Sequence, residues 1–179
     1  MGRYAEGTSV PMERSRVEVE RTLVRYGASG FAYSWERREQ ALPIAAHHAW
    51  CPLRSNPKDP RPPRCTCGRP ATLTREVVIV AFKMPVAGGS RHVQLEVPMP
   101  HELEVGTKAK ADAATRQRWR ALVLVLKAKL EAVASGISTL EAEFLANVVM
   151  ADGRTIGAAI LPRLTEACDT GRLLPAHEG

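Results

Sequence analysis

The amino-acid sequence predicts an α+β fold in which a three-stranded antiparallel meander packs against a long helix and further C-terminal helices. Two stretches, GFAYSWE at 30–36 and RHVQLEVP at 91–98, show the two-residue alternation of a strand. EVVIVAFKM at 76–84 is a β-branched run typical of a buried strand, and a Gly-Gly turn joins it to the next strand as a hairpin. Apolar residues at helical spacing predict the long helix at 113–135.

A first helix precedes the strands. Pro11 lies near its start and Gly27 at its end, as a left-handed cap. Its apolar residues recur at helical spacing: Met12, Val19, Leu23 and Tyr26. After a polar connection at 101–112, the long helix runs from about Ala113 to Ser135. Its apolar stripe consists of Trp119, Leu122, Val123, Leu126, Leu130 and Val133.

The region after Gly136 predicts two further helices. Ser138 and Glu141 form a capping box that starts a helix reaching Met150. The stretch ADGRT is a turn, and IGAAILPRLTEAC is a last short helix interrupted by Pro162. Cys168 stands alone on this apolar helix, so we expect it to be a packed core residue.

The length of 179 residues suits one domain with a core of its own. We expect a disordered N-terminus at 1–10, a single α+β domain at 11–170 and a loose tail at 171–179. Between the first two strands the domain carries an insertion, 41–75, which contains three of the four cysteines.

The charge balance favours an acidic partner. The net charge is +6 and the isoelectric point about 9.5, which suits nucleic acid but equally suits a basic surface that serves only solubility. The N-terminus has no apolar segment typical of a secretory signal, and the longest apolar run, 121–126, is far short of the ~20 residues of a membrane span. We therefore expect a cytoplasmic protein with reduced thiols and no membrane partner.

Catalytic motifs are missing from the sequence. It contains no phosphate-binding loop, no serine nucleophile elbow and no paired-histidine metalloprotease motif. Glu141 and Glu143 are close together, but they fall in the first turn of a helix, where carboxylates stabilise the macrodipole. The sequence therefore predicts that the protein is not an enzyme.

The insertion contains residues with the chemistry of a zinc site. His48, Cys51, Cys65 and Cys67 combine a His-Cys pair with a Cys-x-Cys pair, and His47 is an alternative to His48 as the fourth ligand. Zinc prefers four such ligands in a tetrahedron, and a stretch without an apolar core needs something to order it. Two alternatives stay open: a mobile basic loop with free thiols, or a disulfide.

Basic residues gather in two places. One group occupies the connection and the first turns of the long helix, where positive charge opposes the helix macrodipole, so phosphate binding would explain its position better than helix stability: Lys108, Lys110, Arg116, Arg118 and Arg120. The second group lies in the insertion: Arg54, Lys58, Arg61, Arg64 and Arg69. A solvated basic face is the alternative reading of both groups.

Phe31, Tyr33 and Trp35 share one face of the first strand. Such a stripe is either part of the core under the helices or a platform on which single-stranded bases stack. If it is core, Ala32 and Ser34 face solvent or a partner.

Several stretches together resemble a group of uncharacterised proteins from tailed bacteriophages and prophages. These are VERTLVRYGASGFAYSWE, VVIVAFKM, RHVQLEVPMP and RQRWRALVLVLKAKLEAVASGISTLEAEFLANVVMADGRTIGAAILPRL, which span about 16–164. The cysteine insertion is where this chain departs from the group. The order helix, three-stranded meander, long helix is also similar to the core of Rad52-like single-strand annealing proteins, at the level of fold only.

The resemblance implies a phage or prophage protein in a bacterial host cell that binds single-stranded DNA and promotes annealing without ATP, as a homo-oligomer. The basic residues that we expect to contact phosphates are Arg91, Arg116, Arg118, Arg120 and Lys127, with Arg61 and Arg64 of the insertion. The alternative is a non-enzymatic phage accessory module whose zinc-stabilised loop binds a host or phage protein.

The zinc hypothesis predicts a mass excess of one zinc ion. We expect native mass spectrometry of protein purified without added metal to show this excess, and the double variant Cys65→Ser, Cys67→Ser to lose it. A metal-free wild-type protein would contradict the zinc site.

Overall fold

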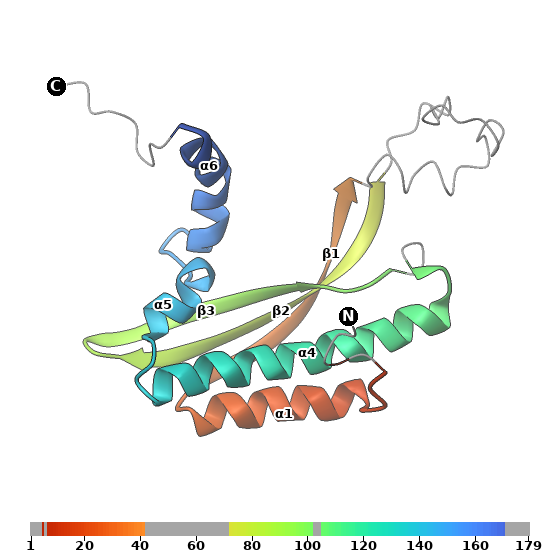
Figure 1. Cartoon of the computed structure of the whole chain (residues 1–179), viewed down its shortest axis with the longest axis horizontal. Helices are drawn as coiled ribbons and strands as arrows, with labels where there is room; N and C mark the ends of the chain where they lie inside the picture. Colours follow the sequence, from red (N-terminus) through yellow and green to blue (C-terminus); the bar gives the residue numbers. More distant parts are fainter. Residues whose placement is uncertain (1–4, 6, 42–71, 102–104, 171–179) are drawn as a thin grey trace.

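The computed structural model describes residue 5 and residues 7–41, 72–101 and 105–170. Within them the α+β prediction is confirmed: a helix is followed by three strands, a long helix and further C-terminal helices (Figure 1). The elements are α1 (Met12–Arg25), β1 (Ser29–Ala41), β2 (Thr72–Val86), β3 (Gly89–Pro98), α4 (Lys108–Ala134), α5 (Leu140–Phe144), the 3₁₀ helix η1 (Leu145–Asn147) and α6 (Ile156–Thr170).

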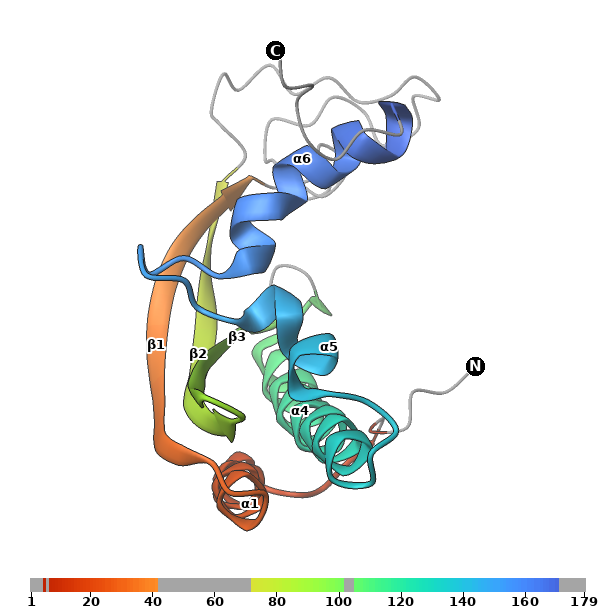
Figure 2. The ribbon, with the colours of Figure 1, turned by 90° about the vertical axis from the view of Figure 1, so that its left-hand side faces the viewer.

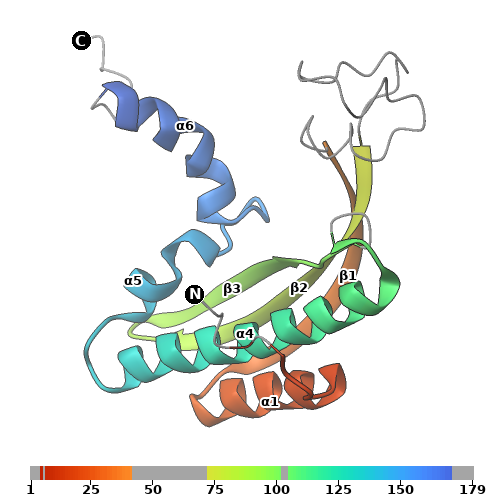
Figure 3. The same cartoon turned by 45° about the vertical axis from the view of Figure 1, so that its right-hand side comes forward.

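The three strands form an antiparallel sheet in the order β1-β2-β3. In its middle, Ser34 of β1 pairs with Ile79 of β2, which in turn pairs with Glu96 of β3. The strands are longer than predicted, so the ends of the expected insertion at 41 and 72–75 belong to β1 and β2. Residues 72–75 of β2 pair with β1 alone and form a two-stranded ribbon that extends beyond β3 (Figures 1 and 3).

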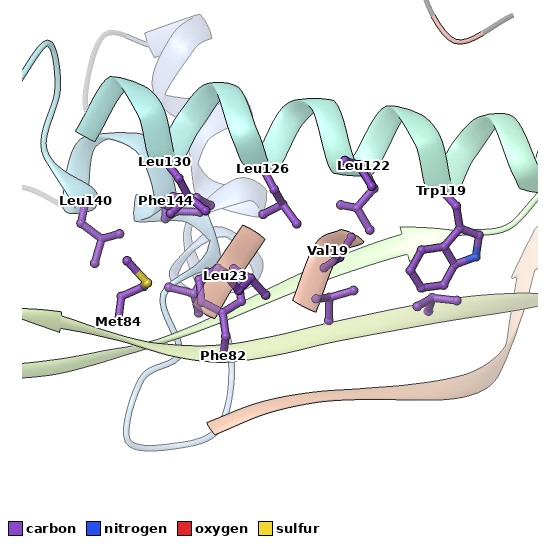
Figure 4. Packing of buried hydrophobic residues seen from close by; sticks show 14 of the residues in the cluster. Val19, Leu23, Phe82, Met84, Trp119, Leu122, Leu126, Leu130, Leu140 and Phe144 are labelled. Carbon is purple, nitrogen blue, oxygen red and sulfur yellow. The ribbon is translucent and has the colours of Figure 1, made fainter. Parts of the chain in front are cut away.

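The core lies between one face of the sheet and the helices. Every second side chain of β2 is buried toward α4, which contributes a stripe at helical spacing, and Figure 4 shows the two rows facing each other. The rows consist of Val78, Val80, Phe82 and Met84 from β2, and of Trp119, Leu122, Leu126 and Leu130 from α4. Val19 and Leu23 of α1 join the same cluster, which makes one continuous core.

Helices α1 and α4 lie side by side and run parallel, so both begin at the same end of the domain (Figure 1). Seen along the sheet, they lie on the concave side of the curved strands (Figure 2). The predicted left-handed cap of α1 is confirmed, because Gly27 has φ 85° and its N–H donates to Val24 O at 3.0 Å.

The long helix begins earlier than predicted. Thr107 caps it, with its side chain accepting a hydrogen bond from Lys110 N at 3.3 Å. Residues 108–112, expected to be part of a polar connection, are therefore the first helical turn. The N-cap residue was not recognised because a threonine within a charged stretch gives only a weak boundary signal.

The helix predicted from Ser138 to Met150 is present but shorter, so the prediction was wrong in its bounds. Thr139, one residue later, is the cap and accepts from Ala142 N at 3.1 Å, and α5 ends at Phe144. Val148 forms an isolated bridge with Val93, and Val149 N donates to His92 O at 2.9 Å. The free edge of β3 offers hydrogen bonds to these β-branched residues, and this extended pairing replaces the helix.

Helix α6 also differs from the prediction. It continues through Pro162 instead of being interrupted there. The proline removes one backbone donor, whose expected acceptor belongs to Ala158, an exposed residue that water can reach. Cys168 is exposed, so the prediction of a packed core residue was wrong as well. No helix in the described ranges is both long and apolar enough to cross a lipid bilayer.

The core geometry predicts the effect of truncating α4. Leu126→Ala removes a fully buried side chain from the middle of the stripe, so we expect a loss of about 2–5 kcal/mol in the free energy of unfolding. Urea denaturation measures it. As a control, Val24→Ala on α1, where the side chain is 62% exposed, should change stability by less than about 0.5 kcal/mol.

Candidate nucleic-acid interface

The aromatic stripe of β1 changes character along the strand. All three rings lie on the helix side of the sheet, where Phe31 packs against the core. Tyr33 and Trp35, further along the strand, are 42% and 41% exposed. In the sheet β1 is an edge strand, hydrogen-bonded to β2 on one side. The stripe is thus core at its start and surface further along. Ala32 and Ser34 on the opposite face are exposed.

An arginine lies over the exposed part of the stripe. The guanidinium carbon of Arg16, on α1, is 4.1 Å from the ring centre of Tyr33 and 5.9 Å from that of Trp119. Trp35 contacts Trp119 with ring centres 6.4 Å apart and the planes tilted by 50°. We call Arg16, Tyr33, Trp35 and Trp119 the aromatic–arginine cluster. Because Trp119 is buried in the core, it fixes the position of the exposed Trp35.

An open groove of about 590 Å³ adjoins this cluster. It is lined by the first turns of both helices and by the segment before α1: Ser9, Pro11, Met12, Glu13, Asp112, Thr115 and Arg116. Arg16 follows Met12 by one helical turn, and Trp119 follows Thr115 by one turn. The groove and the cluster are therefore one helical turn apart along both helices, with the groove at the end where α1 and α4 begin.

The predicted phosphate-binding residues fall in different places. Arg116 lines the groove and is half-buried, with no ion pair to another described residue. Arg118 donates to Pro98 O, at the end of β3. Arg91 lies 3.7 Å from the Glu141 carboxylate, near α5. Arg61 and Arg64 lie outside the described residues. The structure thus does not gather the predicted set into one patch.

Arg120 and Lys127 share one carboxylate. Both side chains donate to Glu18 of α1, Arg120 at 2.5 Å, and together they join the two parallel helices. The hydrogen bond from Lys127 lowers the pKa of the Glu18 carboxyl below its ordinary value, and the hydrogen bond from Arg120 and the charges of both side chains add to this shift. Burial of the carboxyl opposes it. These two cations therefore have a structural partner in addition to any external ligand.

The opposite face of the sheet carries its own ion-pair network. Arg38 spans from β1 to β3 and donates to Glu96 at 2.6 Å and to Glu36 at 2.7 Å. Hydrogen bonding from Arg38 lowers the pKa of Glu96, while burial opposes the shift. Val77 and Ile79 are buried on this same face. Arg38 is thus paired with two carboxylates of the sheet itself, so its guanidinium is not a free site for a phosphate.

Sequence reasoning missed Arg16, the cation nearest to the exposed rings. Its position beside the apolar stripe of α1 was the available signal, since such a side chain lies at the border of the buried face. Its contact with Tyr33 depends on how α1 packs on β1, which spacing along the chain does not give.

The predicted zinc ligands His48, Cys51, Cys65 and Cys67, with the alternative His47, lie outside the described residues, and zinc binding stays a prediction. In the part of the chain that the structure describes, no three His, Cys, Asp or Glu side chains are grouped as a metal site would require.

No family model matches the sequence, and comparisons with curated proteins and with solved structures find no match. The resemblance to phage proteins and to annealing proteins therefore stays a prediction.

The shared carboxylate predicts a pH dependence. Because the folded pKa of Glu18 lies below its unfolded value near 4.5, its contribution is fully present above that value and is lost as the pH falls toward the folded pKa. We expect Glu18→Gln to reduce the free energy of unfolding by roughly 0.5–1 kcal/mol at pH 7, and by progressively less below pH 4.5.

Denaturant unfolding at a series of pH values measures this difference. Glu20→Gln, at an exposed position of the same helix, is the matched control and should stay close to wild type throughout. A Glu18→Gln deficit that persists unchanged at pH 3 would show that the carboxylate charge is not the cause.

Proposed function

We propose that this protein binds single-stranded DNA at the aromatic–arginine cluster and promotes annealing of complementary strands without ATP, as a homo-oligomer. One observation carries the proposal: Tyr33 and Trp35 are each about two-fifths exposed on the edge strand β1, and the guanidinium of Arg16 lies over the ring of Tyr33. Tyrosine and tryptophan are large apolar side chains, so their exposure side by side calls for a ligand that uses it.

Unpaired bases are well suited to such a surface. Every base has a flat π-face that stacks on an aromatic ring or on a guanidinium, so binding of this kind needs no particular sequence. Base pairs in a duplex are stacked on each other and cannot offer these faces. The chemistry of the cluster thus favours a single strand over a duplex.

The surrounding charges favour a phosphate backbone. The exposed cations Arg14, Lys108 and Lys110 lie in the first turns of the parallel helices, and Arg116 lines the groove between them. Both helix N-termini add the positive end of a macrodipole at the same side of the domain. Further along β1, Arg37 is 79% exposed and lies 3.9 Å from Glu76, a loose pair that leaves its guanidinium accessible.

A second candidate is a protein-interaction module, which the exposed apolar residues of α6 favour: Ile160, Leu161 and Leu164. In that case the proposed zinc-stabilised insertion would bind a host or phage protein. The two candidates differ in their response to salt, because phosphate contacts make log affinity fall linearly with log salt.

The proposal predicts which arginine of α1 matters. Arg16→Ala removes the cation stacked on Tyr33, whereas Arg21→Ala removes an exposed cation on the other side of the same helix. We expect Arg16→Ala to weaken binding of a fluorescent oligothymidine by about tenfold and to lower the salt slope by about one. Fluorescence anisotropy at several salt concentrations measures both, and Arg21→Ala should differ little from wild type.

The rings themselves provide the complementary test. Trp35→Ala should weaken binding by roughly 1–3 kcal/mol, the contribution of one stacked base, with an unchanged salt slope. Circular dichroism melts identify any loss of folding. Equal affinity of wild type and Trp35→Ala, with both folded, would contradict the proposed site.

A further inference from the structure

Helix α6 exposes an apolar face. Ile160, Leu161 and Leu164 are 40%, 61% and 39% exposed, and the exposed Cys168 follows one turn later. These positions recur at i, i+1, i+4 and i+8, which places them on one side of the helix. A single exposed leucine is ordinary, but four exposed apolar residues on one side of a helix indicate a contact surface.

Contacts at the N-terminal end of α6 fix the direction of the helix. Its first residues pack on η1, where Ile156 N donates to Val148 O at 2.9 Å. Gly157 lies so close to η1 that a Cβ at this position would be 2.7 Å from Ala146 O, so only glycine permits this approach. From this joint α6 rises away from α4, as Figures 1 and 3 both show. The exposed face is therefore held away from the core of its own chain.

Helix α4 has a second surface of complementary character. The side opposite the buried stripe is half-buried to exposed. Between Lys110 and Glu131 its charged residues lie only at the borders, where Arg118 donates to Pro98 O. This uncharged face consists of Ala114, Gln117, Ala121, Leu124, Val125 and Ala128. Val125 is 47% exposed, and the alanines leave shallow hollows between the larger side chains. The cations at its borders, Arg120, Lys127 and Lys129, are held by Glu18 and Glu143.

We infer that α6 of one copy of the protein docks on the uncharged face of α4 of the next copy. Large aliphatic side chains on α6 match a face of small residues on α4, which is how helix ridges fit helix grooves. The dimensions agree: α6, with 15 residues, is about 22 Å long, and the uncharged face extends over about 21 Å from Ala114 to Ala128. Both contact surfaces occur on this chain, so a second copy of the same chain is the partner.

Such a contact is head-to-tail. Because two different surfaces meet, a pair of copies keeps one free α6 and one free α4 face, and assembly continues into a ring or a filament. A single helix face buries less than the ~800 Å² per partner of a stable interface, so assembly depends on protein concentration. This inference specifies the homo-oligomer of the proposed function but does not depend on DNA, so assembly without DNA tests it separately.

Two single variants test the inference. Leu161→Glu places a charge on α6, and Val125→Glu places one on α4, each at an exposed position where the fold tolerates it. Sedimentation velocity over a range of concentrations, without DNA, should show self-association of the wild type and monomers of each variant. An equimolar mixture of the two variants should form a 1:1 complex that does not grow, because each supplies the surface that the other lacks.

The controls separate this arrangement from others. Val24→Glu changes a 62% exposed valine on α1, outside both surfaces, and should assemble like the wild type, as should Arg16→Ala. If Val125→Glu still assembles, α6 binds another α6; if Leu161→Glu still assembles, α4 binds another α4. Either result overturns the inference, as does a wild type that stays monomeric or a mixture that forms no complex.

Discussion

The contact between α4 and β2 is the constraint on which the rest of the structure depends. The buried rows of the two elements interlock from Trp119 to Leu130 of α4, which fixes the helix across the concave side of the sheet. Three features follow from this placement. Helix α1 fills the remaining space beside α4, β1 is left as an edge strand, and Trp119 comes to lie beneath Trp35. The candidate interface is thus assembled by core packing, although none of its exposed residues belongs to the core.

Several cations of this chain serve the fold as well as the surface. Arg118, Arg120 and Lys127 hold α4 to β3 and to α1, so removing them would weaken the domain together with any phosphate contact. The basic residues most accessible to a ligand lie instead in the first turns of the helices, where they reduce helix stability. A positive charge that is unfavourable for its helix and makes no ion pair with another described residue is the kind that a bound anion would stabilise.

The periodicity of apolar residues predicted the helices and strands that have one buried face. It failed where contacts between distant segments determine the local structure. The strands and both long helices were found because each has one clear buried face. The segment 148–150 was taken for helix because the hydrogen bond that Val149 makes with His92 cannot be seen from local sequence. Cys168 was placed in the core since its helix is apolar, yet a helix that leaves the domain exposes its apolar side. Arg16 was missed because its partner Tyr33 comes from a separate element.

The ribbon at the outer ends of β1 and β2 has a consequence for how this chain can vary. Residues 72–75 pair with β1 alone, and none of them belongs to the buried cluster. The segment 42–71 leaves and re-enters the domain at this tip, so its length has little effect on the core. Closing a longer loop costs only about 0.6 kcal/mol for each doubling of its length. The tip is therefore a place where evolution or an engineer can change the length of the connecting segment while the domain keeps its stability.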